Sequence, residues 1–399
     1  MRVDRADREL AAREAGFLDV RARREFVIAC LAGLFYSVTQ NYSALLAVVF
    51  AASGHDLPAI GLLLSLFSIP VLFGTLASSA IVARIGVLAA IRCAAFCTAA
   101  GIGSLAVTRS DFSLALASRL VQGFGAGLLL PALMTYVQSR LNRARFVYLV
   151  TAFSAVIPLA AAISPPLGEW TFEHYGTQAL FIEAAVPGLL CCALTFLLRP
   201  MAPHKRSGRS LSTGLRRRFV VPVIAVVTGG ALYGFIISYL AAALLARGIA
   251  LGVFFIPSTL AMLASRFGAM RRLQVLHPGS LVAGGLVVSA IGFGLAAIAT
   301  AAPVAALAGV ALGAGNSVMF PVVAAWMSEG LAPGERAGPQ AIAATGFYFG
   351  TYAMPYPETF MVAAWGYAGA ETALAVLACA IALLLVLAPR SWLQGGLAE

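Results

Sequence analysis

Long apolar segments separated by short polar breaks run through almost the whole sequence, and they constrain its fold more than any other feature. Hydrophobic residues make up 61% of the 399 residues and charged residues only 11%. A soluble domain carries about a quarter charged residues, whereas a helix that crosses a bilayer needs roughly 20 apolar residues in a row. The composition therefore predicts an integral membrane protein whose surface faces lipid.

Twelve apolar segments can be placed along the chain, six in each half. They predict an all-α membrane protein with 12 transmembrane helices in two pseudo-symmetric six-helix bundles. The predicted spans are 26–51, 58–81, 87–108, 112–137, 147–169 and 179–198, then 219–243, 249–266, 279–300, 303–327, 338–358 and 367–388. The predicted domains are a cytoplasmic N-terminal segment 1–25, a first bundle 26–198, a basic cytoplasmic linker 199–218, a second bundle 219–388 and a cytoplasmic tail 389–399.

The basic residues test this count, because cytoplasmic loops of membrane proteins carry an excess of Lys and Arg. With a cytoplasmic N-terminus, all of the 27 basic residues, Arg266 included, fall on the cytoplasmic side except Arg109, Arg119 and Arg247. The pattern predicts a bacterial-type inner membrane with both termini in the cytoplasm. The basic segments would lie on the anionic inner leaflet, which accounts for the net charge of +11 without nucleic acid.

Cysteines and known nucleotide-binding motifs give no sign of a cofactor. All six cysteines fall inside apolar runs, and none has the spacing of a metal or redox site. No G-x-x-x-x-G-K-[ST] loop for ATP is present. We expect no cofactor and no metal, with a proton gradient as the energy source. Residues 1–24 are too charged for a cleavable signal peptide.

An internal repeat relates the two halves. A shift of 190 positions aligns GFGAGLLLPALMTY (123–136) with GAGNSVMFPVVAAW (313–326), and the same shift places Pro165 over Pro355. Glycine and proline are common in membrane helices, so the shared offset carries more weight than either match. Duplicated halves are typical of transporters whose site lies at the repeat interface near the bilayer midplane.

The fourth span contains the sequence RLVQGFGA, with Arg119, Gln122, Gly123 and Gly125. It resembles the R-x-x-Q-G-x-G-A motif of the major facilitator superfamily, and in particular of its twelve-span drug:proton antiporters. The resemblance implies two helical bundles that expose a central site to one side of the membrane at a time.

Two further motifs match that superfamily in part. The loop after the second span keeps Arg84 and Gly86 of the family's loop motif, but Ala83 stands where the family has an acidic residue that latches one conformation. The fifth span keeps Pro165 and Gly168 of the antiporters' G-P-x-x-G-G signature. The resemblance implies a conformational role for these residues, together with Gly123 and Gly125.

Arg119 is the main candidate for substrate binding or proton coupling. A charge deep in a span costs roughly 2.5–3.5 kcal/mol on insertion scales and usually faces the protein interior. Its repeat partner is Gly309, so the architecture alone does not require an arginine. The alternative is that Arg119 only ties spans together through backbone carbonyls. For proton exchange the best acid is Glu183 of the sixth span, whereas Glu358, like Glu169, suggests a solvated helix end.

A polar cluster in the first span and tyrosines in the second half are candidates for lining a cavity. Amide side chains without partners are costly in lipid, so they should point inward, although hydrogen bonding between helices is an equal alternative. Tyrosines offer aromatic area with polar tips, and ordinary packing is their alternative. The candidates are Tyr36, Gln40, Asn41, Gln122, Tyr233, Asn316, Tyr348 and Tyr352.

These observations predict a secondary active transporter, most simply a monomer that exports a small organic molecule in exchange for protons. Metabolites, metallophores or siderophores, and drugs are the substrate classes considered, and a buried arginine with few buried acids favours a substrate bearing carboxylates or other hydrogen-bond acceptors. An importer and a broad multidrug efflux pump are alternatives on the same fold. A channel or an intramembrane enzyme is less favoured, because the four histidines lie in loops or near helix ends.

Overall fold

The computed structural model describes residues 20–108, 111–140, 146–200, 219–269, 275–329, 331 and 337–387, and every regular element within these ranges is helical. The N-terminal segment before residue 20, linker residues 201–218 and the tail from residue 388 lie outside the described residues. The first half contains α2 (Val20–Asn41), η1 (Tyr42–Leu45), α3 (Leu46–Ala52), α4 (Leu57–Leu66), α5 (Ser68–Ile85), α6 (Val87–Thr108), α7 (Phe112–Arg140) and α8 (Phe146–Thr195). The second half contains α9 (Val220–Phe235), η5 (Ile236–Leu240), α10 (Ala241–Ala246), α11 (Leu251–Ala264), η6 (Ser265–Ala269), α13 (Pro278–Ala297), α14 (Ala302–Ser328), α15 (Ala337–Ala353) and α16 (Pro355–Leu387).

Ten helical segments of the described chain are long and apolar enough to cross a membrane. The two longest each contain a glycine in the left-handed region, with φ of 78° at Gly176 and 66° at Gly366. Only glycine adopts such a conformation without strain, so the chain turns there and each segment makes two passes. The result is the predicted twelve passes. Gly176 and Gly366 also lie 190 positions apart, which is the shift of the internal repeat.

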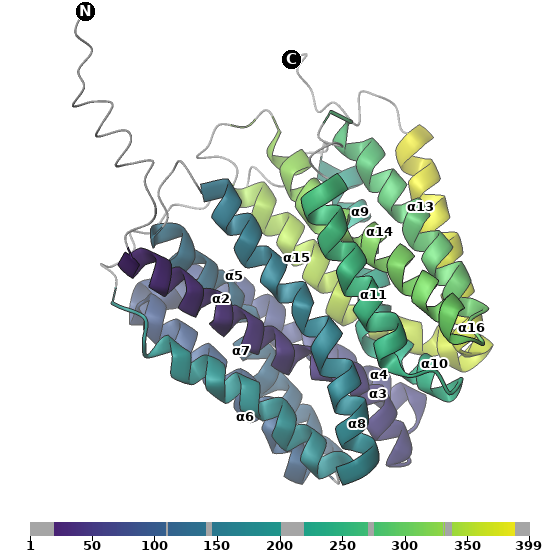
Figure 1. Cartoon of the computed structure of the whole chain (residues 1–399), viewed down its shortest axis with the longest axis horizontal. Helices are drawn as coiled ribbons and strands as arrows, with labels where there is room; N and C mark the ends of the chain where they lie inside the picture. The colour runs from purple at the N-terminus through teal and green to yellow at the C-terminus, as the bar shows by residue number, and fades with distance from the viewer. Residues whose placement is uncertain are drawn as a thin grey trace, which may run out of the picture.

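The helices form two bundles, drawn in purple to teal for the first half and in green to yellow for the second (Figure 1). In the first half α2 packs on α8, and α7 packs on α5 and α6. In the second half α14 packs on α11 and α13, α13 also packs on α16, and α9 packs on α15. The predicted fold class is confirmed.

Repeated glycines allow the close helix packing in both halves. A Cβ atom on Gly123 would lie 2.6 Å from the carbonyl oxygen of Phe67 in the second span, and one on Gly313 would overlap the backbone of Ser258 in the eighth. A Cβ on Gly125 would lie 2.5 Å from the carbonyl oxygen of Ala94. Small residues at such crossings let backbones touch, so packing of the fourth and tenth spans explains why these glycines recur at the repeat shift.

The bundle has two ends, which we call the terminal side and the far side. The terminal side holds the first residue of α2 and the last residue of α16; the far side holds the glycine turns at Gly54, Gly176, Gly248 and Gly366. Towards the far side a continuous apolar core joins the halves and includes Leu45 of the first half and Phe254 of the second. Towards the terminal side the first bundle has a separate apolar core. The halves are therefore joined more fully at the far side.

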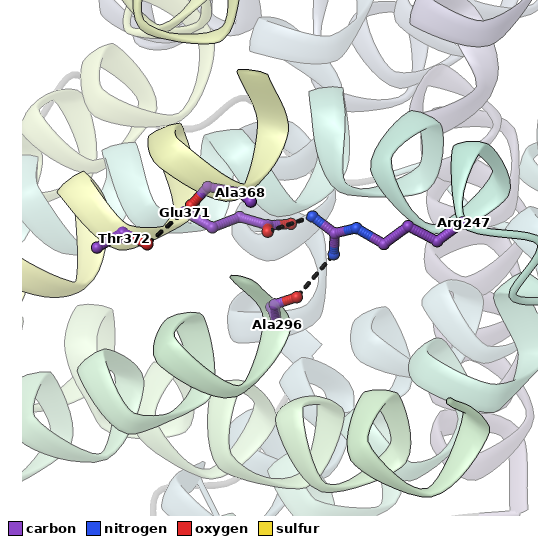
Figure 2. A network of polar contacts seen from close by, with 5 residues as sticks. All are labelled: Arg247, Ala296, Ala368, Glu371 and Thr372. Carbon is purple, nitrogen blue, oxygen red and sulfur yellow. Dashed lines mark hydrogen bonds and ion pairs between the residues drawn. The ribbon is translucent and has the colours of Figure 1, made fainter. Parts of the chain in front are cut away.

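Arg247, which stands outside the basic pattern of the sequence, is held by a buried ion pair on the far side (Figure 2). One terminal nitrogen lies 2.6 Å from a carboxylate oxygen of Glu371, and the other donates to the carbonyl oxygen of Ala296 at 2.6 Å. Glu371 is fully buried. The arginine therefore ties the end of α10 to α13 and α16 within the second bundle.

Candidate functional site

A cavity of about 390 Å³ lies between the two bundles, within the ordinary size range of small-molecule sites. Each half contributes an interrupted helix to its wall. The first span is broken by the 3₁₀ segment η1, which supplies Ser43, and the seventh by the π-helical segment η5, which supplies Ile237 and Ser238. Such interruptions free backbone groups and are frequent at functional sites.

Arg119 lies at the wall of this cavity and is 2% exposed. Its Nε donates to the carbonyl oxygen of Leu63 at 3.4 Å, and Nη1 donates to the Ser43 hydroxyl at 3.4 Å and to the side-chain oxygen of Gln122. The guanidinium carbon lies 4.2 Å from the centroid of the Phe67 ring. Among the described residues no hydrogen bond uses Nη2, so this nitrogen is available to a ligand.

A chain of hydrogen bonds extends from Arg119 into the first span. Gln122 is fully buried and donates from Nε2 to the side-chain oxygen of Gln40 at 2.8 Å. The amide of Gln40 in turn lies 3.5 Å from the hydroxyl of Tyr36, which donates to the carbonyl oxygen of Ala126 at 3.2 Å. The structure thus unites the predicted polar residues of the first and fourth spans, and their packing fixes the position of Arg119.

Asn41 belongs to the same wall, although it lies outside this chain. It lines the cavity, and its Nδ2 donates to the carbonyl oxygen of Ser37 at 2.8 Å. Its side-chain oxygen accepts no hydrogen bond from the described residues, so it is available as an acceptor for a ligand.

The second half supplies mainly aromatic surface. The predicted residues Tyr233, Tyr348 and Tyr352 all line the cavity. Tyr233 stacks on Phe347 with 6.0 Å between ring centroids, and Tyr352 meets the Phe67 ring edge-on at 4.9 Å. Because Phe67 also lies under Arg119, the second half approaches the arginine through Tyr352.

Asn316 is the polar group of this wall with the clearest need for a ligand. It lines the cavity from α14 and is 8% exposed, yet neither its side-chain nitrogen nor its oxygen has a hydrogen-bond partner among the described residues. An unsatisfied buried amide costs free energy that a bound polar molecule recovers. Asn316 is therefore placed to contact substrate.

Arg266 corrects one interpretation of the sequence. The basic pattern assigns it to a cytoplasmic loop, but α11 continues into the π-helical segment η6, and Arg266 lies there at the cavity wall. The hydropathy of the sequence carries no sign of this, because the residue lies where an apolar run ends. The cavity thus has one arginine from each bundle.

The acids lie elsewhere. No Asp or Glu is among the described residues that line the cavity. Glu183 accepts a hydrogen bond from the Tyr42 hydroxyl at 2.9 Å within the first bundle, and the structure does not bring it to Arg119. The interpretation of Glu358 as a solvated helix end is wrong, because this residue is 3% exposed. The charged residues among the described lining of the cavity are therefore both arginines, Arg119 and Arg266.

The residues of the conformational motifs stand outside the cavity. Arg84 is exposed near the end of α5, and Gly86 ends that helix with φ of 86°. Pro165 is buried in the fifth span, and a Cβ on Gly168 would lie 2.5 Å from the side chain of Leu45. These residues shape turns and helix contacts.

Three hydrogen bonds join the two bundles across the described chain. The Ser65 hydroxyl donates to the carbonyl oxygen of Ala353 at 3.2 Å, and the Thr259 hydroxyl donates to that of Pro158 at 3.4 Å. Nearest the far side, the backbone N–H of Leu251 donates to the Glu169 carboxylate at 2.8 Å. All three lie at mid-depth or beyond it, so the structure is closed on the far side.

Comparison with known proteins shows which family and which solved structures this chain resembles. The family model described as Major Facilitator Superfamily matches residues 26–281. A POT family transporter in complex with a thioalcohol conjugated peptide is similar at 14% identity, with a TM-score of 0.77 over 92% of this chain and 96% of that one.

Two other solved structures resemble the chain over nearly their whole length. The nucleoside transporter NupG matches with a TM-score of 0.70 at 14% identity, over 91% of this chain and 98% of that chain. A D-xylose-proton symporter matches with a TM-score of 0.72 at 17% identity, over 90% and 96%. No curated protein matches the sequence significantly.

Proposed function

The chain belongs to the Major Facilitator Superfamily and is an integral multi-pass membrane protein, and from this premise we propose that it is a secondary active transporter that exports a small organic anion in exchange for protons. The observation that carries the proposal is that Arg119 and Arg266, one from each bundle, both line a cavity whose described lining contains no acid. Two guanidinium groups beside one confined space favour a ligand of negative charge.

The lining supports an organic anion over an inorganic one. Arginine presents a planar fork of N–H donors that matches a carboxylate, and Asn316 adds an unsatisfied amide. Tyr233, Tyr348 and Tyr352 provide apolar area beside these polar groups. A carboxylate on an apolar or aromatic body satisfies both kinds of surface, as an acidic metabolite or a metallophore does.

Alternating access is the mechanism that this arrangement favours. The far side is closed by bonds between the bundles, and the cavity lies between two halves related by a repeat. Rocking of one bundle against the other opens the cavity to each side in turn. An anion held between Arg119 and Arg266 touches both bundles, so its binding favours their approach.

Orientation follows from the charges of the sequence. Arginine and lysine residues gather at the ends of spans on the terminal side, and cytoplasmic loops carry this excess. We assign the terminal side and both termini to the cytoplasm of a bacterial-type inner membrane, with the basic segments on its anionic leaflet. The closed far side then faces outward. One chain contains both halves of the cavity, so a monomer suffices.

The direction of transport can be tested in everted membrane vesicles. An inside-acid pH gradient should drive uptake of the anion if the protein is an exporter that exchanges protons. Uptake driven by the opposite gradient would instead indicate proton symport, which is the activity named for the D-xylose-proton symporter of similar fold.

The substrate class can be tested by binding alone. Purified protein is screened against aliphatic and aromatic carboxylates, amino acids and organic cations for an increase in melting temperature. We expect carboxylates to stabilise the wild type and to lose this effect in Arg119→Ala. Arg92→Ala is the matched control, because Arg92 lies in the same bundle, donates to the carbonyl oxygen of Thr195 and does not line the cavity. Stabilisation by cations alone would contradict the proposal.

A further inference from the structure

The carboxyl group of Glu358 is buried without a hydrogen-bond donor among the described residues, in a turn of α16 whose next residue packs on α4 of the first bundle. The residue is 3% exposed, and neither side-chain oxygen has a partner among the described residues. It lies in the first turn of α16, one helical turn beyond Pro355, which lines the cavity. Glu358 is therefore close to the transport site and is not used by the binding chemistry described above.

Its surroundings are tightly packed. The next residue, Thr359, packs against Gly61 of α4 so closely that a Cβ on that glycine would overlap its hydroxyl. Thr359 also hydrogen-bonds with the hydroxyl of Tyr239, which donates in turn to the carbonyl oxygen of Pro355 at 3.1 Å. The hydroxyl groups beside Glu358 are thus engaged with one another, and the α4–α16 contact leaves little room for water.

No cation among the described residues compensates Glu358. α4 and α13, two helices packed against α16, contribute no titratable side chain. Tyr239 of η5 is the titratable neighbour that interacts with the carboxyl group, and Tyr233 of α9 lies at the cavity. The remaining titratable groups on neighbouring elements and on α16 itself are Tyr348, Tyr352, Tyr356, Tyr367, Glu371 and Cys379. Glu371 already has Arg247 as its partner.

Burial of an ionised carboxylate without a donor or counter-charge is too costly to persist. The closed interface between α4 and α16 is therefore compatible with Glu358 only when its carboxyl group holds a proton. When the two helices separate, water can reach the group and solvate its ionised form. Protonation of this residue and closure of the far side are thermodynamically linked, because each favours the other.

We propose that Glu358 is the proton-binding residue that couples protonation to closure of the far side. The inference rests on the proposed transport function and adds the site of its coupling ion. A carboxylate oxygen of Glu358 gains a proton from the far side and forms an O–H bond, after which the interface closes around the neutral group. The bond breaks when the proton leaves, and the cavity lined by Pro355, one helical turn away, offers a route for it.

The test follows the far side without any organic substrate, so it stands apart from the binding screen. Nitroxide labels on cysteines introduced at Ser53 and Thr300, exposed far-side positions of the two halves, report the distance between bundles. The full chain is reconstituted in lipid nanodiscs after its six native cysteines are replaced by alanine. We expect the wild type to shift from the short-distance to the long-distance population as the pH rises.

Glu358→Gln mimics the protonated group and should keep the short distance at every pH. Glu358→Asp retains a titrating carboxyl group and should keep a pH response. It therefore shows whether the effect of Glu358→Gln comes from loss of the carboxyl group or from misfolding caused by substitution at this position. Glu183→Gln is the matched control for a half-buried carboxyl elsewhere, one that already accepts a hydrogen bond, and should behave as the wild type. The proposal is overturned if the wild type does not respond to pH, if Glu358→Gln responds as the wild type does, or if Glu183→Gln abolishes the response.

Discussion

The internal repeat relates two interfaces between the bundles, one formed by α8 with α11 and the other by α4 with α16. The carboxyl group at each interface has different surroundings. Glu169 of α8 accepts the backbone N–H of Leu251 at the start of α11, where the helix dipole also favours a negative charge. Glu358 of α16 occupies a nearly equivalent position and has no donor among the described residues. One interface can thus hold an ionised carboxylate, whereas the other requires a neutral one.

The cavity walls show the same asymmetry. Arg119 of the fourth span has Gly309 as its repeat partner, and Asn316 of the tenth has Ala126. The backbones of these spans pack alike through the glycines at 123 and 313. Duplication therefore explains the shared backbone packing of the two halves. The functional groups come from positions where the halves differ, such as Arg119 in the first half and Glu358 in the second.

Removal of Arg119 should have the largest effect on transport, because the first half then loses the charged group that distinguishes its cavity wall from that of the second half. A hydrogen bond to a charged group contributes about 1.5–3 kcal/mol, so Arg119→Ala should lower transport in everted vesicles by roughly 10- to 100-fold. Its insertion in the membrane should not change. Arg92→Ala, outside the cavity, should transport normally. Full transport by Arg119→Ala would remove the assignment of this site.

Loss of Arg247 should have the largest effect on stability. It tests the difference between Glu371, which has a partner, and Glu358, which has none among the described residues. Glu371 is fully buried, and removal of its partner leaves an uncompensated charge. Such losses cost about 3 kcal/mol or more, so Arg247→Ala should lower the melting temperature clearly. Thr372→Ala is the control, because Thr372 is exposed and donates only within its own helix, to Ala368 (Figure 2). Equal melting temperatures for the two variants would contradict the role of the pair.

The sequence predicts the fold well, because its signals act over long stretches. Apolar runs set the helices, and the repeat predicts two related halves, as the glycine turns at Gly176 and Gly366 bear out. It also predicts much of the site: an arginine or amide within a span has to face the interior, and the structure brings Arg119, Gln122 and Gln40 together.

The sequence fails where a residue's surroundings depend on the other bundle. Arg266 ends an apolar run, so it looks like a loop residue until the packing of α11 directs it to the cavity. Glu358 looks like a solvated helix end because its turn of α16 packs, through the next residue Thr359, on Gly61 of α4, nearly 300 positions earlier in the chain. Composition and periodicity contain no information about such contacts.

Glu169→Gln should have an intermediate effect and tests the charged interface directly. The variant keeps an oxygen acceptor for the Leu251 N–H but loses the charge, which weakens the bond by about 1 kcal/mol. The far side should open more readily, with a few-fold shift towards the long distance between labels at residues 53 and 300. The pH response should remain, because Glu358 is intact. A complete loss of that response would transfer the proton-binding role to Glu169.

The smallest effects on substrate binding should come from removing two tyrosine hydroxyls. The two variants compare the polar cavity wall of the first half with the aromatic wall of the second. Tyr36 donates to the carbonyl oxygen of Ala126, so Tyr36→Phe leaves a buried acceptor without its donor and should weaken carboxylate binding by about 1 kcal/mol, or roughly fivefold. The ring of Tyr352 packs on Phe67, and no hydrogen bond from its hydroxyl is found among the described residues. Tyr352→Phe should therefore change the dissociation constant less than about twofold in titration calorimetry. If Tyr352→Phe instead weakened binding more than Tyr36→Phe, its hydroxyl would contact the substrate directly, and the second half would contribute a polar group that the unliganded cavity conceals.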